Sequence, residues 1–82
     1  MNFPKFLKFS QGNKIVQIFS LHSFEEIRKI GSFHQIQHIE VTTHSDRLYV
    51  QDMLALDLSY FISETEYFEL KSSILKRTQL LD

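Results

Sequence analysis

The chain of 82 residues contains no cysteine, only two glycines and no long hydrophobic run. Without cysteine it can form neither disulfides nor thiolate metal sites, and it is compatible with a reducing cytoplasm, where we expect the protein to act. No segment approaches the ~20 apolar residues that a membrane-spanning helix requires. The amino-terminal residues carry lysines and lack the unbroken apolar segment of a signal peptide. We therefore expect no membrane association.

Enzyme motifs are also missing from the sequence. With only Gly12 and Gly31, the chain has no glycine-rich phosphate loop, and no serine lies in a G-x-S-x-G elbow. A domain of this length also leaves little room for a deep pocket once its core is filled. The sequence predicts a non-enzymatic protein with no catalytic residue and no cofactor.

The histidines are the best candidates for a metal site. His38, Glu40 and His44 share one face of an expected strand. However, His38 and His44 are six residues apart, which is about 20 Å along a strand and too far for two ligands of one zinc ion. Only His38 and Glu40 could act together, with further ligands from elsewhere, so we predict no metal site and interpret this face as a solvated surface.

Hydrophobic periodicity predicts a single domain over residues 1–82. Strands are expected at residues 3–10 and 14–21, joined by a turn at Gly12-Asn13, and at 36–43 and 47–50, joined by a turn at 45–46. The strand at 14–21 has apolar residues on both faces, which is typical of a central strand.

Two helices are expected, each beginning with a capping box. Ser23 and Glu26, followed by apolar residues at intervals of three, predict a short helix that ends at Gly31. Ser63 and Glu66, followed by a longer apolar stripe, predict a helix over residues 63–81.

Residues 51–62 fit both a strand and a helix. Apolar side chains alternate from Leu54 to Ile62. A helical period is also present, formed by Val50, Met53, Leu54, Leu58 and Phe61. We predict a strand for at least residues 56–62, because the alternation is long. The predicted fold is α+β: a small antiparallel sheet of four or five strands, in the order β-β-α-β-β-(β)-α, with two helices on one face. The residues expected in the core are Ile15, Phe19, Phe24, Ile27, Ile39, Val41, Leu58, Leu70 and Ile74.

Charge is unevenly distributed along the chain. The net charge is −1, yet residues 1–24 carry three lysines and no acid, and all ten acids follow. The chain also contains eight phenylalanines. In an extended strand Phe6 and Lys8 share a face, which would place an apolar anchor beside a steering charge.

These features predict a protein-protein interaction module, a small regulator, inhibitor or adaptor that docks a protein partner, with a homodimer as one option. The expected partner-binding residues are Lys5, Phe6, Lys8, His38 and Glu40. The alternative is a nucleic-acid-binding protein, because phenylalanines and lysines on the amino-terminal strand could stack bases and contact phosphates. The slightly acidic overall charge disfavours this alternative.

Overall fold

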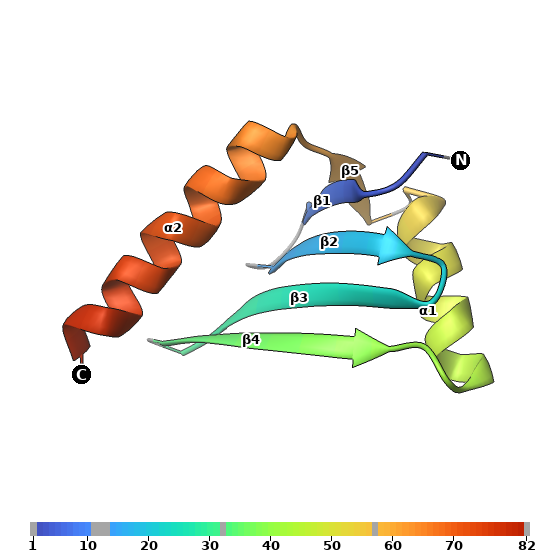
Figure 1. The fold of residues 1–82 in the computed structure, drawn as a ribbon, viewed down its shortest axis with the longest axis horizontal. Coiled ribbons are helices and arrows are strands. Elements are labelled where there is room, and N and C mark those ends of the chain that lie inside the picture. The colour runs from blue at the N-terminus through green and yellow to red at the C-terminus, as the bar shows by residue number, and fades with distance from the viewer. Residues whose placement is uncertain (1, 11–13, 32, 57, 82) are drawn as a thin grey trace.

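The computed structural model describes residues 2–10, 14–31, 33–56 and 58–81. The elements, in chain order, are β1 (Lys5–Phe9), β2 (Lys14–Ser20), β3 (Ser23–Ile30), β4 (Phe33–Glu40), α1 (His44–Leu54), β5 (Ser59–Phe61) and α2 (Glu64–Leu81). The strands form one sheet in the order β4-β3-β2-β1-β5, and all neighbours are antiparallel (Figure 1). The predicted turn at Gly12-Asn13 lies outside the described residues.

The sheet is a four-stranded meander extended by a returning strand. β3 and β4 pair over their full length, from Ser23 opposite Glu40 to Ile30 opposite Phe33. Gly31 follows β3 with a φ of +61°, a left-handed conformation that glycine adopts without steric cost. After α1 the chain returns, and β5 pairs with β1. The two edges of the sheet are therefore β4, with eight residues, and β5, with three.

Each helix covers its own set of strand residues. α1 packs with Val50 and Met53 on a cluster formed by Leu7, Val16, Ile18 and Phe24. α2 packs with Tyr67 on the alternate residues Phe6, Ile15 and Ile27. Because successive side chains of a strand point to opposite faces, the sheet has an α1 face and an α2 face. In Figure 1, α1 lies near the end of the sheet where β2 ends, and α2 lies near the other end.

The predicted α+β class, with an antiparallel sheet and two helices, is confirmed. The arrangement of the helices differs in detail from the expectation that both lie on one face. The reason is visible in β2, which buries Ile15 on the α2 face and both Val16 and Ile18 on the α1 face. A sheet with two apolar faces needs a cover on each.

The short helix predicted after Ser23 is wrong, because residues 23–30 form β3. Phe24 and Ile27 are both buried and are three residues apart, which imitates a helical period. They lie on opposite faces, however: Phe24 belongs to the cluster under α1, and Ile27 belongs to the cluster under α2.

The strand predicted at residues 47–50 is also wrong, because His44–Leu54 is a helix. Its N-cap is Thr43, whose hydroxyl oxygen accepts a hydrogen bond from the backbone N–H of Asp46 at 3.1 Å. Of the strand predicted at residues 56–62, only Ser59–Phe61 forms one, and it follows a turn in which Leu56 has a φ of +62°.

The second predicted helix is confirmed as α2. The hydroxyl oxygen of Ser63 accepts a hydrogen bond from the backbone N–H of Glu66 at 3.0 Å, as a capping residue does. Of the expected core, Ile15, Phe24 and Ile27 are buried, and Ile39, Val41, Leu70 and Ile74 are partly buried. Phe19, beside a register shift in β2, is 37% exposed, and Leu58, just before β5, is 66% exposed.

Candidate functional site

The structure separates the three amino-terminal residues that were expected to bind a partner. β1 lies between β2 and β5 and so is not an edge strand. Phe6 is only 8% exposed, and its ring centroid lies 5.2 Å from that of Tyr67 and 5.8 Å from that of Phe68. Phe6 is therefore a core residue under α2, and it offers no exposed anchor.

Lys5 and Lys8 both lie beside β5, on opposite faces of the sheet. The ammonium of Lys5 lies 5.4 Å from the ring centroid of Phe61, within the range of a cation–π contact. Lys8 is the direct cross-strand partner of Tyr60. Each lysine thus accompanies an aromatic side chain of the edge strand, which places a positive charge beside an apolar surface on both faces.

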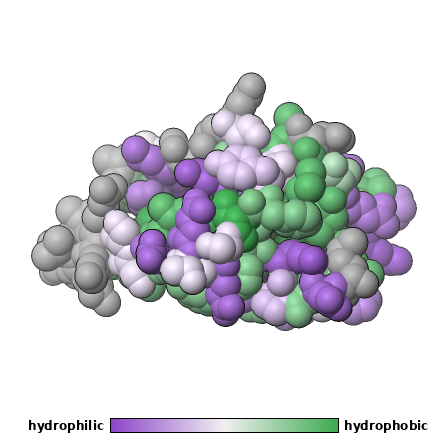
Figure 2. Space-filling model, turned by 90° about the horizontal axis from the view of Figure 1, so that it is seen from above, coloured by the Kyte–Doolittle hydropathy of each residue, from purple (hydrophilic) through white to green (hydrophobic). Residues whose placement is uncertain are grey.

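The apolar side chains of this edge are exposed. Leu58 is 66% exposed, Tyr60 45% and Phe61 47%. Figure 2 views the molecule from the side of β5 and shows apolar residues gathered in this region with hydrophilic residues around them. We call Lys5, Lys8, Leu58, Tyr60 and Phe61 the β5-edge patch.

A hollow lies next to the β5-edge patch on its α1 side. It has a volume of about 340 Å³ and is lined by Phe9, Tyr49, Asp52, Met53, Leu58 and Ser59. The buried Ser59 hydroxyl donates a hydrogen bond to the carbonyl of Met53 at 3.2 Å, which ties β5 to α1. The Ser59–Met53 hydrogen bond therefore holds β5 against α1, and the hollow lies at the border of the β5-edge patch.

His38 and Glu40 lie together near the end of β4. The two side chains form a hydrogen bond of 2.9 Å between Nε2 and Oε1, and both are exposed. The ring of Phe19 lies 5.6 Å from that of His38. Among the described residues, no group of three His, Cys, Asp or Glu side chains could hold a metal ion.

The structure does not bring His38 and Glu40 together with the lysines of β1. Through the register, Phe6 is opposite Gln17, which is opposite Glu25, which is opposite His38. Three strand spacings therefore separate Phe6 from His38, or about 14 Å at ~4.8 Å each. Lys5 and Lys8 therefore lie near one edge of the sheet, and His38 and Glu40 lie at the other.

Sequence reasoning missed a buried carboxylate, Glu26, which is 2% exposed on the α1 face. Its Oε1 accepts hydrogen bonds from Arg28 Nη2 at 2.7 Å and Nε at 3.0 Å, and its Oε2 accepts one from the Tyr49 hydroxyl at 2.8 Å. Lys14 Nζ lies 3.8 Å from Oε2 and donates a hydrogen bond to the Tyr49 oxygen. We call these four residues the Glu26 cluster.

The electrostatics of the Glu26 cluster follow from burial. Burial lowers the pKa of Lys14, and the Glu26 carboxylate opposes that effect. Burial also raises the pKa of Tyr49, as does its hydrogen bond to Glu26. Among the described residues, no buried side-chain polar atom lacks a hydrogen-bond partner. The cluster therefore links α1 to β2 and β3 through paired buried groups.

The signal for this cluster was the alternation in residues 24–29, where Phe24 and Glu26 share one strand face and Glu25 and Ile27 the other. Within the described part of the chain, no helix is long and apolar enough to cross a membrane.

Comparison with models of protein families, with curated proteins and with solved structures finds no significant match to this chain.

Proposed function

We propose that the protein is a non-enzymatic interaction module, a small regulator, inhibitor or adaptor, that docks a protein partner through the β5-edge patch. The observation that supports this proposal is the exposure of Tyr60 and Phe61 on an edge strand, and of Leu58 just before it, beside two lysines. We place its action in the cytoplasm, a reducing compartment with which a cysteine-free chain is compatible.

The patch has the composition of an interface centre. Tyr and Phe bury about 150–250 Å² each, so covering the exposed halves of Tyr60 and Phe61 would remove roughly 100 Å² apiece from water. At ~25 cal/mol per Å², each ring would contribute about 2.5 kcal/mol to binding before the entropic costs of association. Lys5 and Lys8 favour a partner surface whose apolar centre is bordered by acidic side chains.

Nucleic acid is the second candidate partner, because the β5-edge patch combines lysines with aromatic rings. Tyr60 and Phe61 could stack on bases and the lysines could contact phosphates. Against this, Glu64 and Glu66 lie in the first turn of α2, shortly after β5, and they would repel a phosphate backbone. Titration of labelled single-stranded and double-stranded oligonucleotides decides: affinity that falls steeply with added salt would favour nucleic acid, because counterion release accompanies phosphate contacts.

The protein-docking proposal is tested by affinity purification of the tagged full chain from the cells that produce it. Two variants remove the two parts of the patch: Tyr60→Ser with Phe61→Ser removes the anchors, and Lys5→Glu with Lys8→Glu reverses the charge. Phe33→Ser is the matched control, since Phe33 is an exposed aromatic residue, 54% exposed, on the other edge strand.

We expect one partner in stoichiometric amount with the wild type and with Phe33→Ser, and its loss in both patch variants at unchanged thermal stability. Equal recovery of the partner by the patch variants would show that the docking surface lies elsewhere. Recovery of no partner by the wild type would contradict the proposed function.

A further inference from the structure

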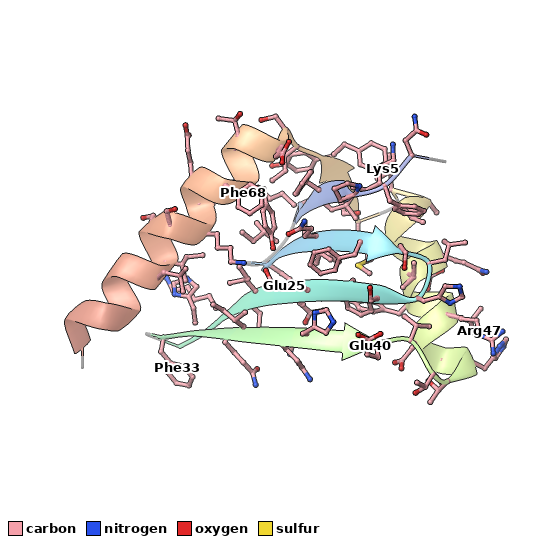
Figure 3. The ribbon with its side chains drawn as sticks, in the orientation of Figure 1. Lys5, Glu25, Phe33, Glu40, Arg47 and Phe68 are labelled. Carbon is pink, nitrogen blue, oxygen red and sulfur yellow. The ribbon has the colours of Figure 1, made fainter. Side chains whose placement is uncertain are left out.

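The second edge of the sheet, β4, has an unpaired outer side. β4 pairs with β3 along all eight of its residues, and among the described residues no strand pairs with its other side. In Figure 3, Phe33 and Glu40 lie near the two ends of this strand, at the border of the sheet. The strand contains no lysine and no proline, the residues that commonly protect a sheet edge from further pairing.

The sequence of β4 is nearly the same in both directions. Residues 34–38 read H-Q-I-Q-H, a palindrome centred on Ile36, and the apolar residues Phe33 and Ile39 flank it. When two identical strands pair antiparallel about a twofold axis at one residue, residues at equal distances from that centre lie opposite each other. A twofold axis at Ile36 would therefore place each residue of this segment opposite one of its own kind.

The backbone of β4 permits this register. Val41, the residue after β4, donates its N–H to the carbonyl of His22 at 2.7 Å, in continuation of the β3–β4 ladder. Since backbone groups alternate in direction along an antiparallel strand, the odd-numbered residues of β4 bond to β3 and the even-numbered ones point outward. Ile36 is even-numbered, so a twofold axis at this residue brings outward-pointing N–H and C=O groups of both strands together.

The side chains match on both faces. On the α2 face, Ile36 is 42% exposed and would cover its counterpart across the axis. On the α1 face, Gln35 would lie opposite Gln37, and Phe33, which is 54% exposed, would lie opposite Ile39. Ile39 is partly buried against the α1 cluster, so Phe33 of the second copy would extend that cluster. Both exposed apolar side chains of β4 thus gain an apolar neighbour.

We propose that β4 pairs with β4 of a second copy about a twofold axis at Ile36 and joins the two sheets into one. A twofold pairing of this kind closes after two copies, because each copy has one β4. The β5-edge patch stays accessible at both outer edges of the joined sheet, so a dimer would present two docking surfaces. The pairing uses residues separate from that patch, so either proposal can fail without the other.

The absence of cysteine allows a direct test of the register. In the proposed dimer, residue 36 faces itself in a hydrogen-bonded pair with a Cα–Cα distance of about 5.5 Å, which a disulfide can bridge. Residue 37 lies opposite residue 35, and its own counterpart is on a diagonal at about 7–8 Å. Under mild oxidation, Ile36→Cys should form a covalent dimer rapidly, and the matched control Gln37→Cys should remain unlinked.

Charge pairing provides a test that needs no covalent bond. Gln35 and Gln37 are both exposed, so substitutions there leave the fold of one copy intact. Gln35→Lys with Gln37→Lys places like charges opposite each other in the proposed register and should yield monomers. Gln35→Glu with Gln37→Lys places opposite charges together and should retain the dimer.

Sedimentation equilibrium of the wild type should give twice the chain mass of 9.8 kDa. A monomer over the whole accessible concentration range would overturn the proposal, and so would species larger than a dimer, because the pairing closes. Faster linking of Gln37→Cys than of Ile36→Cys would overturn the register. None of these outcomes depends on recovery of a partner at the β5-edge patch.

Discussion

Replacement of Glu26 by alanine should destabilise the protein more than any change to an exposed acid. The Glu26 side chain is 3% exposed and accepts hydrogen bonds from Arg28 and Tyr49, with Lys14 nearby. Removal of one partner from a fully buried ion pair costs about 3–5 kcal/mol. The Arg28 side chain is 48% exposed and can be hydrated instead, so we reduce the expected cost to about 2–4 kcal/mol.

This cost is large for so small a domain. At ~0.05–0.15 kcal/mol per residue, a chain of this length has a total stability of about 4–12 kcal/mol. A loss near 3 kcal/mol should lower the melting temperature by roughly 12–24 °C. Urea unfolding followed by circular dichroism measures the change, and Glu40→Ala is the control, because the Glu40 side chain is 68% exposed and should cost less than about 0.5 kcal/mol.

The energetic coupling between Glu26 and Tyr49 distinguishes a buried Glu26 carboxylate in β3 from a Glu26 that caps a helix. If residues 23–30 formed the helix suggested by the capping box, Glu26→Ala would cost only about 1 kcal/mol and would not depend on residue 49. In the structure the Tyr49 hydroxyl donates to Glu26, so a double-mutant cycle with Tyr49→Phe should give a coupling of about 0.5–3 kcal/mol. A cost below ~1 kcal/mol without such coupling would refute the Glu26 cluster and the assignment of β3.

Two further predictions concern the tyrosines. Tyr67 is fully buried between α2 and the sheet, so Tyr67→Ala should lower the free energy of unfolding in urea by about 3–5 kcal/mol. Phe68 is 40% exposed, so Phe68→Ala should cost less than half of that. Equal costs would contradict the placement of α2. Burial raises the pKa of Tyr49 and of Tyr67, so each contributes stability that is complete below the unfolded-state pKa of ~10 and is lost as pH rises through the folded-state value. Burial lowers the pKa of Lys14, so this residue changes stability with pH in the opposite sense, and the tyrosine effect is tested by comparison with the Tyr49→Phe variant. The wild type should lose more free energy of unfolding above ~pH 10 than this variant. Equal losses would contradict the burial of the Tyr49 hydroxyl.

The sequence predicted the fold class because hydrophobic patterning marks where apolar faces begin and end. α2 was found because its cap, Ser63 with Glu66, and its apolar stripe agree, and the structure confirms both. β3 was misassigned because it is covered on both faces. Its buried residues, Phe24 and Ile27, are spaced as on a helix although they point in opposite directions.

α1 was missed although a capping signal was present. Thr43 with Asp46 has the spacing of a helix N-cap, and the structure forms that hydrogen bond. The apolar alternation from Leu54 onward favoured a strand instead. Only Ser59–Phe61 forms a strand, which pairs with β1 from Leu7 opposite Phe61 to Phe9 opposite Ser59.

The candidate site depended on long-range pairing, which periodicity cannot reveal. The alternation in residues 5–8 placed Phe6 and Lys8 on one face correctly, but it could not tell that α2 covers that face over Phe6. Nor could it tell that β5 would lie outside β1 and bring Tyr60 and Phe61 beside the lysines. Both facts are set by contacts between residues more than fifty positions apart.

The two edges of the sheet offer partners different kinds of contact. β5 is three residues long, too short to specify a partner strand, so recognition there has to come from the side chains of Leu58, Tyr60 and Phe61. β4 is eight residues long, and the outward-pointing backbone groups of its even-numbered residues can supply a regular ladder of hydrogen bonds, so the side chains need only fix the register. An edge of the second kind suits a strand of matching pattern, and the palindrome around Ile36 provides that strand in a second copy of the chain. The β5 edge suits a partner of different sequence, whose acidic border the two lysines can select.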